Sequence, residues 1–202
     1  MATDTFATLG KQEAIRQLFE GTKFKPFEEP VFFHSPERSY ITTSTKSFLE
    51  GIDFDLVYFP LKHLGYKCVL ATTAELFAVM SHPRTLSICL GVSAKLDFEH
   101  VKELWSGVLA AAREYGYRSL SLDIQPSKNG LAISVSATGE TTELMAKRRS
   151  VVHSKDLICV SGALGAAFLG QSLLESEKAR FEKGAVKTEV LEKYKMFVGA
   201  YL

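Results

Sequence analysis

The sequence predicts an α+β fold, in which a mixed β-sheet with the order β-α-β-α-β-β carries its helices on one face. Three observations predict it. Residues 85–93 alternate between apolar and small polar side chains, as a half-buried strand does. Residues 98–115 repeat their apolar side chains at helical spacing. Two more alternating runs, 119–125 and 130–138, flank the turn-forming sequence PSKN and are predicted to form a hairpin.

The elements before residue 85 follow from the same patterns. Apolar side chains on one side predict a helix over 12–20, which Gly21 ends. Residues 23–36 hold three of the six prolines, so we expect an extended stretch around a short strand at 31–33. A strand is predicted at 40–45. The helix predicted at 61–80 has apolar residues on more than one side, which indicates burial on more than one side.

The later elements complete the predicted chain. Asp97 is the expected N-cap of the helix at 98–115. Beyond the second alternating run we predict a strand at 157–161, a helix from 164 to about 179 and a helix at 188–198. We therefore expect one domain over residues 1–160 and a helical extension over residues 161–202 that leads toward a further domain.

Composition narrows the classes of function. The chain has 202 residues, 46% of them apolar and 23% charged, with a formal net charge of +1. So small a net charge provides no field for DNA, RNA or anionic lipid. We expect neither a membrane span nor a signal peptide, and therefore a cytoplasmic protein. The cysteines, Cys68, Cys89 and Cys159, lack metal-binding spacing and are expected to be buried and reduced.

The two faces of the predicted sheet differ in chemistry. The face expected against the helices is apolar: Leu86, Ile88, Leu120, Leu122, Ile133 and Val135. The other face is small and uncharged: Ser87, Cys89, Ser119, Ser121, Ser134 and Ser136. Small side chains let a second sheet approach closely, so we expect this face to pack on its copy in a two-fold homodimer. The alternative is a hydrated face rich in serine and threonine.

Five segments, read in order along the chain, resemble one enzyme family. They are 49–54 (LEGIDF), 64–67 (LGYK), 75–79 (ELFAV), 130–135 (GLAISV) and 156–162 (DLICVSG). Together they are similar to the N-terminal domain of thiamine-monophosphate kinase, in the AIR synthase superfamily. The resemblance implies a dimer whose two sheets close into a barrel. It also implies a site for ATP and magnesium ions, held by aspartates of this domain and completed by a second domain.

Four site motifs of that family are altered here. The family's G-D-D corresponds to 27–29 (FEE), S-T-D to 44–46 (STK), S-D to 74–75 (AE) and G-G-D-T-T to 121–125 (SLDIQ). The candidate nucleotide-binding residues are Asp123, Glu75 and Lys46, and the candidate metal ligands are Asp123, Glu75, Glu28 and Glu29. Alternatively these carboxylates are hydrated or paired with lysines, and Lys46 could itself pair with Glu28, Glu29, Glu75 or Asp123.

Each change alters what the site can bind. A glutamate in place of an aspartate moves the carboxylate by about one carbon–carbon bond, roughly 1.5 Å, and the octahedral shell of magnesium tolerates this poorly. Lys46 places a cation where the family has a cation ligand. Two hypotheses follow: a non-catalytic, dimeric binding or assembly module with no catalytic residue of its own, or a Mg-ATP-dependent kinase of small phosphorylated acceptors that needs a second domain or chain. The expected partners are a second copy of the chain and either a partner protein or the family's second domain.

Overall fold

The computed structural model describes residues 6–24, 39–148, 153–184 and 188–202. They divide into two compact units. The first unit comprises residues 1–54 and 61–151, and the second comprises residues 55–60 and 152–202. In the parts of the chain that the structure describes, no helix is both long and apolar enough to cross a membrane.

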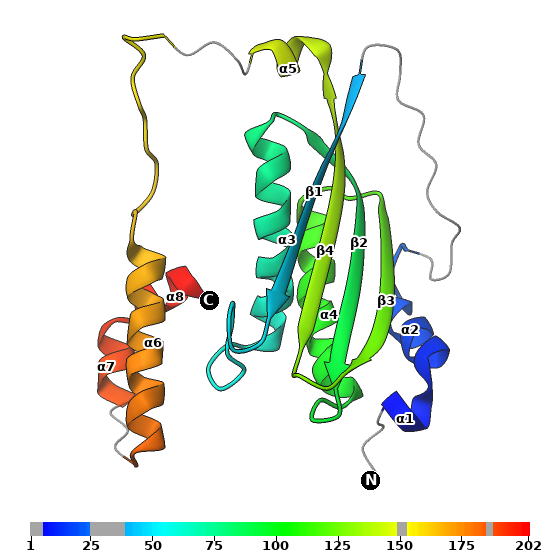
Figure 1. Cartoon of the computed structure of the whole chain (residues 1–202), viewed down its shortest axis with the longest axis vertical. Coiled ribbons are helices and arrows are strands. Elements are labelled where there is room, and N and C mark those ends of the chain that lie inside the picture. The colour runs from blue at the N-terminus through cyan, green and yellow to red at the C-terminus, as the bar shows by residue number, and fades with distance from the viewer. Residues whose placement is uncertain (1–5, 25–38, 149–152, 185–187) are drawn as a thin grey trace. The chain divides into compact units, whose positions relative to one another are not determined.

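The first unit is built on a four-stranded mixed sheet (Figure 1). Its strands are β1 (Ser39–Leu49), β2 (His82–Ser93), β3 (Ser119–Ser127) and β4 (Ala132–Thr142), in the spatial order β1-β4-β2-β3. Strands β2 and β3 are parallel, whereas β4 is antiparallel to both β1 and β2. The predicted α+β class with a mixed sheet is confirmed.

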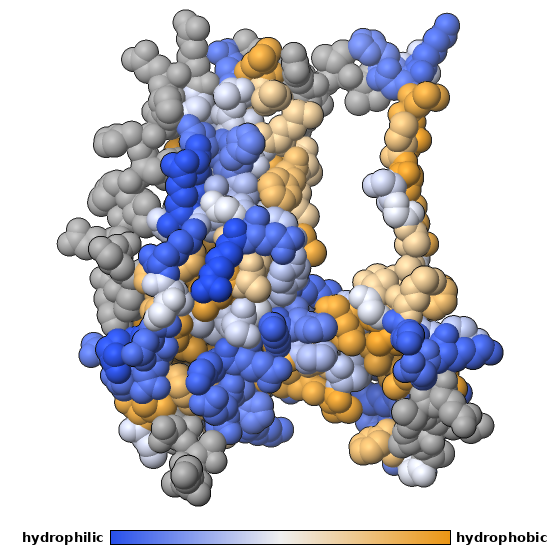
Figure 2. Space-filling view, turned by 180° about the vertical axis from the view of Figure 1, so that it is seen from behind, coloured by the Kyte–Doolittle hydropathy of each residue, from blue (hydrophilic) through white to orange (hydrophobic). Residues whose placement is uncertain are grey.

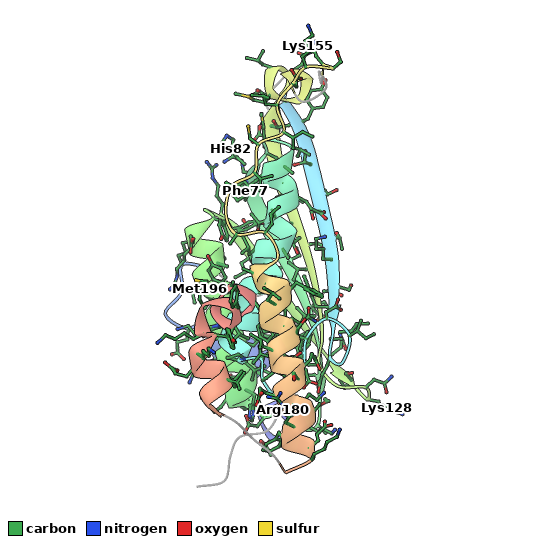
Figure 3. All side chains as sticks on the ribbon, turned by 90° about the vertical axis from the view of Figure 1, so that its left-hand side faces the viewer. Phe77, His82, Lys128, Lys155, Arg180 and Met196 are labelled. Atoms are coloured by element: carbon green, nitrogen blue, oxygen red, sulfur yellow. The ribbon has the colours of Figure 1, made fainter. Side chains whose placement is uncertain are left out.

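Helices α3 (Leu61–Ala78) and α4 (Phe98–Glu114) both lie on one face of this sheet, as Figures 1 and 3 show. Asp97 is the N-cap of α4, as predicted. Its carboxylate accepts the backbone N–H of His100, and the His100 side chain accepts the backbone N–H of Asp97. The helix side of the sheet forms the core. Leu86, Ile88, Ile133 and Val135 are at most 3% exposed, Leu120 is 6% exposed, and Leu122 is half-buried.

The two helices touch through glycines. A Cβ on Gly65 of α3 would lie 2.1 Å from the backbone oxygen of Leu104, and a Cβ on Gly107 of α4 would lie 1.8 Å from that of Lys62. No side chain fits at either position, so the backbones approach each other directly. This contact accounts for the glycine in the LGYK segment and leaves α3 buried on two sides, by the sheet and by α4.

Short elements flank this core. Helices α1 (Phe6–Leu9) and α2 (Lys11–Phe19) precede the sheet, and α5 (Glu143–Arg148) follows it. Helix α2 packs on α4: the indole N–H of Trp105 donates to the Leu18 carbonyl at 2.8 Å, and the ring centroids of Phe19 and Trp105 are 5.3 Å apart. The short strand predicted at 31–33 lies outside the described residues.

The predicted hairpin between β3 and β4 is wrong, because β2 lies between the two strands. The loop that follows β3, with Lys128 projecting from the end of the sheet in Figure 3, crosses β2. Glu50 binds the far side of this loop: its carboxylate accepts the Leu131 N–H at 2.7 Å, and its own N–H donates to the Leu131 carbonyl at 3.0 Å. Turn-forming residues predict a change of direction, but they do not select the neighbouring strand.

The second unit is a small helical assembly of α6 (Ala166–Glu182), α7 (Thr188–Lys193) and α8 (Lys195–Tyr201). Helices α6 and α8 pack closely, since a Cβ on Gly170 would lie 2.0 Å from the Phe197 carbonyl oxygen. Residues 55–60 join this unit through three contacts: Asp55 with Lys178, Tyr58 with Glu175, and the ring of Phe59 with that of Tyr201 at 5.4 Å.

Three predictions for the later residues and cysteines are corrected. Residues 157–161 form no strand, because no described segment pairs with them. The helix predicted at 188–198 is divided into α7 and α8 around Tyr194. Cys68 is buried as expected, whereas Cys89 and Cys159 are exposed, because Cys89 lies on the open face of the sheet and Cys159 lies in the unpaired run.

Candidate functional site

The helix side of strand β1 carries the first group of candidate residues. Thr42, Ser44 and Lys46 alternate onto this side, since their partners on β4 are Gly139, Ala137 and Val135, all of which are buried. β1 is an outer strand of the sheet, so the side chains at its margin reach helix α3 without a neighbouring strand in the way.

The carboxylate of Glu75 on α3 forms an ion pair with Lys46 and a hydrogen bond with Ser44. The Lys46 ammonium lies 2.5 Å from Glu75 Oε1, and the Ser44 hydroxyl donates to Glu75 Oε2 at 2.7 Å. Ser44 is 5% exposed, whereas the side chains of Lys46 and Glu75 are 35% and 52% exposed. The bond from Lys46, followed by that from Ser44, lowers the pKa of Glu75 below its ordinary value. Both carboxylate oxygens of Glu75 are therefore engaged by donors of the protein itself.

The end of α3 is fixed to the same margin of the sheet. Met80 adopts a left-handed backbone with φ of 54°, and its carbonyl accepts the Thr141 hydroxyl at 3.0 Å. The hydroxyls of Thr42 and Ser81 lie 2.6 Å apart. These bonds hold Glu75, one turn earlier, opposite β1.

Asp123 lies elsewhere. It is the register partner of Cys89 in the β2–β3 pair, and Cys89 is exposed on the face of the sheet that the helices leave open. Neighbouring register partners point to the same side, so Asp123 is on the open face as well. Its carboxylate accepts the Gln125 amide at 2.9 Å and lies 4.0 Å from the Cys89 sulfur.

The structure thus brings Lys46 and Glu75 together and separates both from Asp123. Lys46 and Asp123 are on opposite faces and on the two outer strands, which are three strand spacings, about 14 Å, apart. Glu28 and Glu29 lie outside the described residues. Within the described ranges, no three His, Cys, Asp or Glu side chains are grouped to hold a metal ion. The described acidic residues therefore do not fit a magnesium ion, because one carboxylate is taken by an ammonium and the other is remote.

The LEGIDF segment has a structural role. Glu50 binds both backbone groups of Leu131, as described above, and Asp53 accepts the Leu49 N–H at 2.8 Å. Gly51 between them has φ of 81°, a left-handed conformation that favours glycine. These acidic side chains close the turn that follows β1.

The open face of the sheet is a regular array of hydroxyls. Three pairs of neighbouring side chains bond across the strands: Thr45 with Ser136 at 3.0 Å, Ser47 with Ser134 at 3.0 Å, and Thr85 with Thr138 at a short 2.5 Å. Ser87 and Ser121 lie beside them and are exposed. The only acidic residue along β3 is Asp123.

Two residues of these sites were missed by sequence reasoning. Ser44 is bound to the carboxylate of Glu75, and its spacing of two from Lys46 was the available signal that both share one side of a strand. The Gln125 amide donates to the Asp123 carboxylate, and the same spacing of two residues, here on β3, was the available signal. No local signal places Cys89 next to Asp123, since their proximity depends on the pairing of β2 with β3.

Comparisons with known proteins agree with this fold. The family model "AIR synthase related protein, N-terminal domain" matches residues 28–141. Thiamine-monophosphate kinase of Bacillus subtilis (strain 168) is 25% identical over 141 residues, which are 70% of this chain and 43% of that protein. The Aquifex aeolicus (strain VF5) protein of the same name is 29% identical over 173 residues, covering 86% and 54% of the two chains.

A solved structure, AaThiL complexed with AMPPCP and TMP, superposes with a TM-score of 0.57 at 22% identity, covering 71% of this chain and 45% of that one. At this identity the likeness concerns the fold alone. The chain spans about half the length of the curated relatives that it matches. Because the family model covers more than half of the 202 residues, the chain belongs to the AIR synthase related protein family through its N-terminal domain.

Proposed function

We propose that this chain is a non-catalytic member of its family that acts as a binding or assembly module. The observation that carries the proposal is the ion pair of Lys46 and Glu75, in which an ammonium occupies the carboxylate that a divalent cation would need. Phosphoryl transfer from ATP depends on such cations, because they neutralise the charge that develops on the phosphates. The distance of Asp123 from this pair supports the same conclusion.

Calorimetric titration of the chain with ATP and magnesium chloride tests this proposal. We expect no magnesium-dependent heat with millimolar nucleotide. Lys46→Asp is the matched variant, because it removes the ammonium and adds a second carboxylate next to Glu75. Magnesium-dependent binding by the unaltered chain that is lost in Asp123→Asn would overturn the proposal, since Asp123 would then be a ligand in the assembled protein.

We further propose that the module is a homodimer in which the two hydroxyl-lined sheet faces meet. The family resemblance implies such a dimer, whose two sheets close into a barrel. The face carries small side chains on all four strands, and a second sheet can approach such a surface closely. Sedimentation velocity tests it, with Ser136→Arg in the centre of the face. We expect this variant to be monomeric, whereas Ser106→Arg on the outer side of α4 keeps the dimer. A monomer in the unaltered chain would contradict the proposal.

The alternative function is a Mg-ATP-dependent phosphotransferase that needs a second domain or chain. Its support is that the relatives are named thiamine-monophosphate kinases and that one related structure holds AMPPCP and TMP. In that case the site residues would include Asp123, Glu75 and Lys46, with Glu28 and Glu29 completing a metal site. We also propose, as a division by function, a domain over residues 1–160 and a helical extension over 161–202.

A further inference from the structure

Three aromatic rings gather where the outer side of α3 meets the end of α4. Tyr66 and Phe77 come from α3, and Tyr115 is the C-cap residue of α4. The ring centroids of Tyr66 and Tyr115 are 6.1 Å apart, and those of Phe77 and Tyr115 are 5.8 Å apart. The planes of these two pairs are inclined by 55° and 67°. Tyr115 therefore has a ring on either side that is inclined to its own rather than stacked on it.

The side of α3 that carries these rings is apolar and open to water. Tyr66, Leu70 and Phe77 share one side of the helix, because a turn has 3.6 residues, and Leu70 lies between the two rings along the axis. Leu70 and Phe77 are 38% and 46% exposed. Figure 2 shows apolar surface over α3, and Figure 3 shows Phe77 on the side of α3 opposite strand β1.

Hydrogen bonds fix two of the three rings. The Tyr66 hydroxyl donates to Glu114 Oε2 at 2.8 Å. Because a hydroxyl has a single proton, it accepts the second bond, of 2.9 Å, from the Tyr115 hydroxyl. The bond with Tyr115, followed by burial and the bond with Glu114, raises the pKa of Tyr66 above its ordinary value. Phe77 is held by its edge-to-face contact with Tyr115, so the rings are in position before any ligand binds.

Three sources of negative potential meet at these rings. The face of each aromatic ring carries the negative part of its quadrupole. Glu114 adds an exposed carboxylate. The C-terminus of α4, a helix of 17 residues, is the negative end of its dipole. A cation with alkyl groups gains from all three sources and also covers Leu70, whereas an anion would be repelled.

We propose that the three rings and Glu114 bind an organic cation with an alkylated ammonium head group, whose alkyl groups lie on Leu70. Such a head group occurs in free small molecules and in methylated lysine side chains of proteins. The recognition chemistry is the same in both cases, because aromatic rings bind the delocalised charge of the head group and the carboxylate balances it. The two sources are separated by the experiment.

This site is separate from the ion pair of Lys46 and Glu75. Glu75 and Phe77 are two residues apart on α3, so their side chains project about 200° apart around the helix. The rings also lie on the helix side of the sheet, and not on its hydroxyl-lined face. The inference therefore depends neither on nucleotide binding nor on a dimer.

Two other interpretations compete with this one. In the first, the rings only join α3 to α4, and the cluster stabilises the fold without binding a ligand. In the second, the rings bind a neutral apolar ligand. Such a ligand would contact the rings and Leu70 but would displace water from the Glu114 carboxylate without replacing its hydrogen bonds.

NMR titration of the 202-residue chain with choline chloride tests the proposal. We expect saturable shifts of the ring signals of Tyr66, Phe77 and Tyr115, with a dissociation constant in the millimolar range. The matched probe is the neutral alcohol in which a carbon atom replaces the choline nitrogen. It should bind at least about tenfold more weakly, because it has the shape without the charge.

A short peptide that carries one trimethyllysine provides the second arm, with the same peptide carrying unmodified lysine as its control. Tighter binding of the trimethyllysine peptide than of choline would assign the site to a protein partner. Tighter binding of choline would assign it to a free small molecule. Both results support the proposal, since the head group is the same.

Two variants connect the binding to the named residues. Phe77→Leu keeps an apolar side chain and removes one ring, and we expect it to weaken choline binding about three- to fivefold. Glu114→Gln removes the charge and should weaken binding to a similar extent. Glu103→Gln, the same change at an exposed position earlier on α4, should leave the affinity unchanged. Urea denaturation followed by Trp105 fluorescence checks that each variant is folded.

Three results would overturn the proposal. They are an absence of ring shifts with both choline and the trimethyllysine peptide, equal affinity for choline and its neutral analogue, and unchanged affinity in both Phe77→Leu and Glu114→Gln. The first result would leave the cluster with a role in joining the helices, and the second would favour an apolar ligand. No nucleotide or magnesium is present, so these results are distinct from those of the calorimetric titration.

Discussion

The two compact units of this chain bury their apolar side chains to very different extents. The first unit places Trp105, Tyr117 and a set of leucines, isoleucines and valines in one core between sheet and helices. Among the described residues of the second unit, the buried apolar side chains are Phe59, Ala166, Leu174 and Tyr201. Many others stay exposed: Val57, Leu157, Ile158, Val160, Leu164, Phe168, Leu169, Phe181, Tyr194 and Met196.

Helix content alone therefore does not provide a core. Both units contain a pair of helices in backbone contact through glycine, at Gly65 and Gly107 in the first and at Gly170 in the second. Among the residues that the structure describes, only the first pair also has a sheet to cover. A unit of this size without a sheet or a third layer buries too little apolar surface to be stable by a wide margin. Substitutions at the two contacts should therefore affect the chain differently.

The largest effect is expected at Gly107. In Gly107→Ala the new methyl group would overlap the Lys62 carbonyl oxygen and force α3 and α4 apart. We expect the free energy of unfolding of the first unit to fall by about 3 kcal/mol. Urea denaturation followed by the fluorescence of Trp105, the single tryptophan, measures it. Gly199→Ala in α8, where no atom lies within 4 Å, is the control and should leave this transition unchanged.

A smaller effect is expected from Gly170→Ala in the second unit. The methyl group would meet the Phe197 carbonyl oxygen and loosen the packing of α8 on α6. We expect a loss of about 2 kcal/mol, visible as faster amide exchange in α6. The Trp105 transition should stay in place. A shift as large as that of Gly107→Ala would show that the two units unfold together.

Removing one buried hydroxyl from the core of the first unit should lower the free energy of unfolding by less than either glycine substitution. The hydroxyls of Tyr117 and Thr73 lie 2.8 Å apart, and the Thr73 hydroxyl also donates to the Val69 carbonyl at 2.7 Å. Tyr117→Phe should cost about 1 kcal/mol, because Thr73 keeps its second partner. Thr73→Val should cost more, since the buried Tyr117 hydroxyl then loses its partner. Equal losses in the two variants would argue against this difference.

The smallest effect concerns the exposed pair on β1 and α3. Because Lys46 lowers the pKa of Glu75, Lys46→Met should raise that pKa toward the ordinary value of a glutamate. The pair stabilises the fold above the unfolded pKa of the carboxyl group, and this contribution is lost as pH falls through the lowered folded pKa. Carbon-detected NMR titration of the Glu75 carboxyl group measures the change. An unchanged pKa would mean that Ser44 alone holds the carboxylate.

The sequence predicted most elements of the first unit because their signals are local. Each of these signals depends on residues within one turn or one strand. They are the alternation of β2, the helical spacing and Asp97 cap of α4, and the extent of α3. The altered S-D and S-T-D segments were equally visible. They identified Lys46 and Glu75 as candidates for one site before any geometry was known.

Tertiary structure alone decided which strands pair and which faces the site residues share. The hairpin prediction failed because β2 entered between β3 and β4, and the predicted strand at 157–161 failed because no described segment pairs with it. The packing of α3 against β1 joined Lys46 to Glu75, and the pairing of β3 with β2 put Asp123 beside Cys89 on the opposite face. A strand's pattern records how its two sides are covered, whereas its neighbours are chosen by segments far along the chain, so sequence periodicity determines the element and packing determines the site.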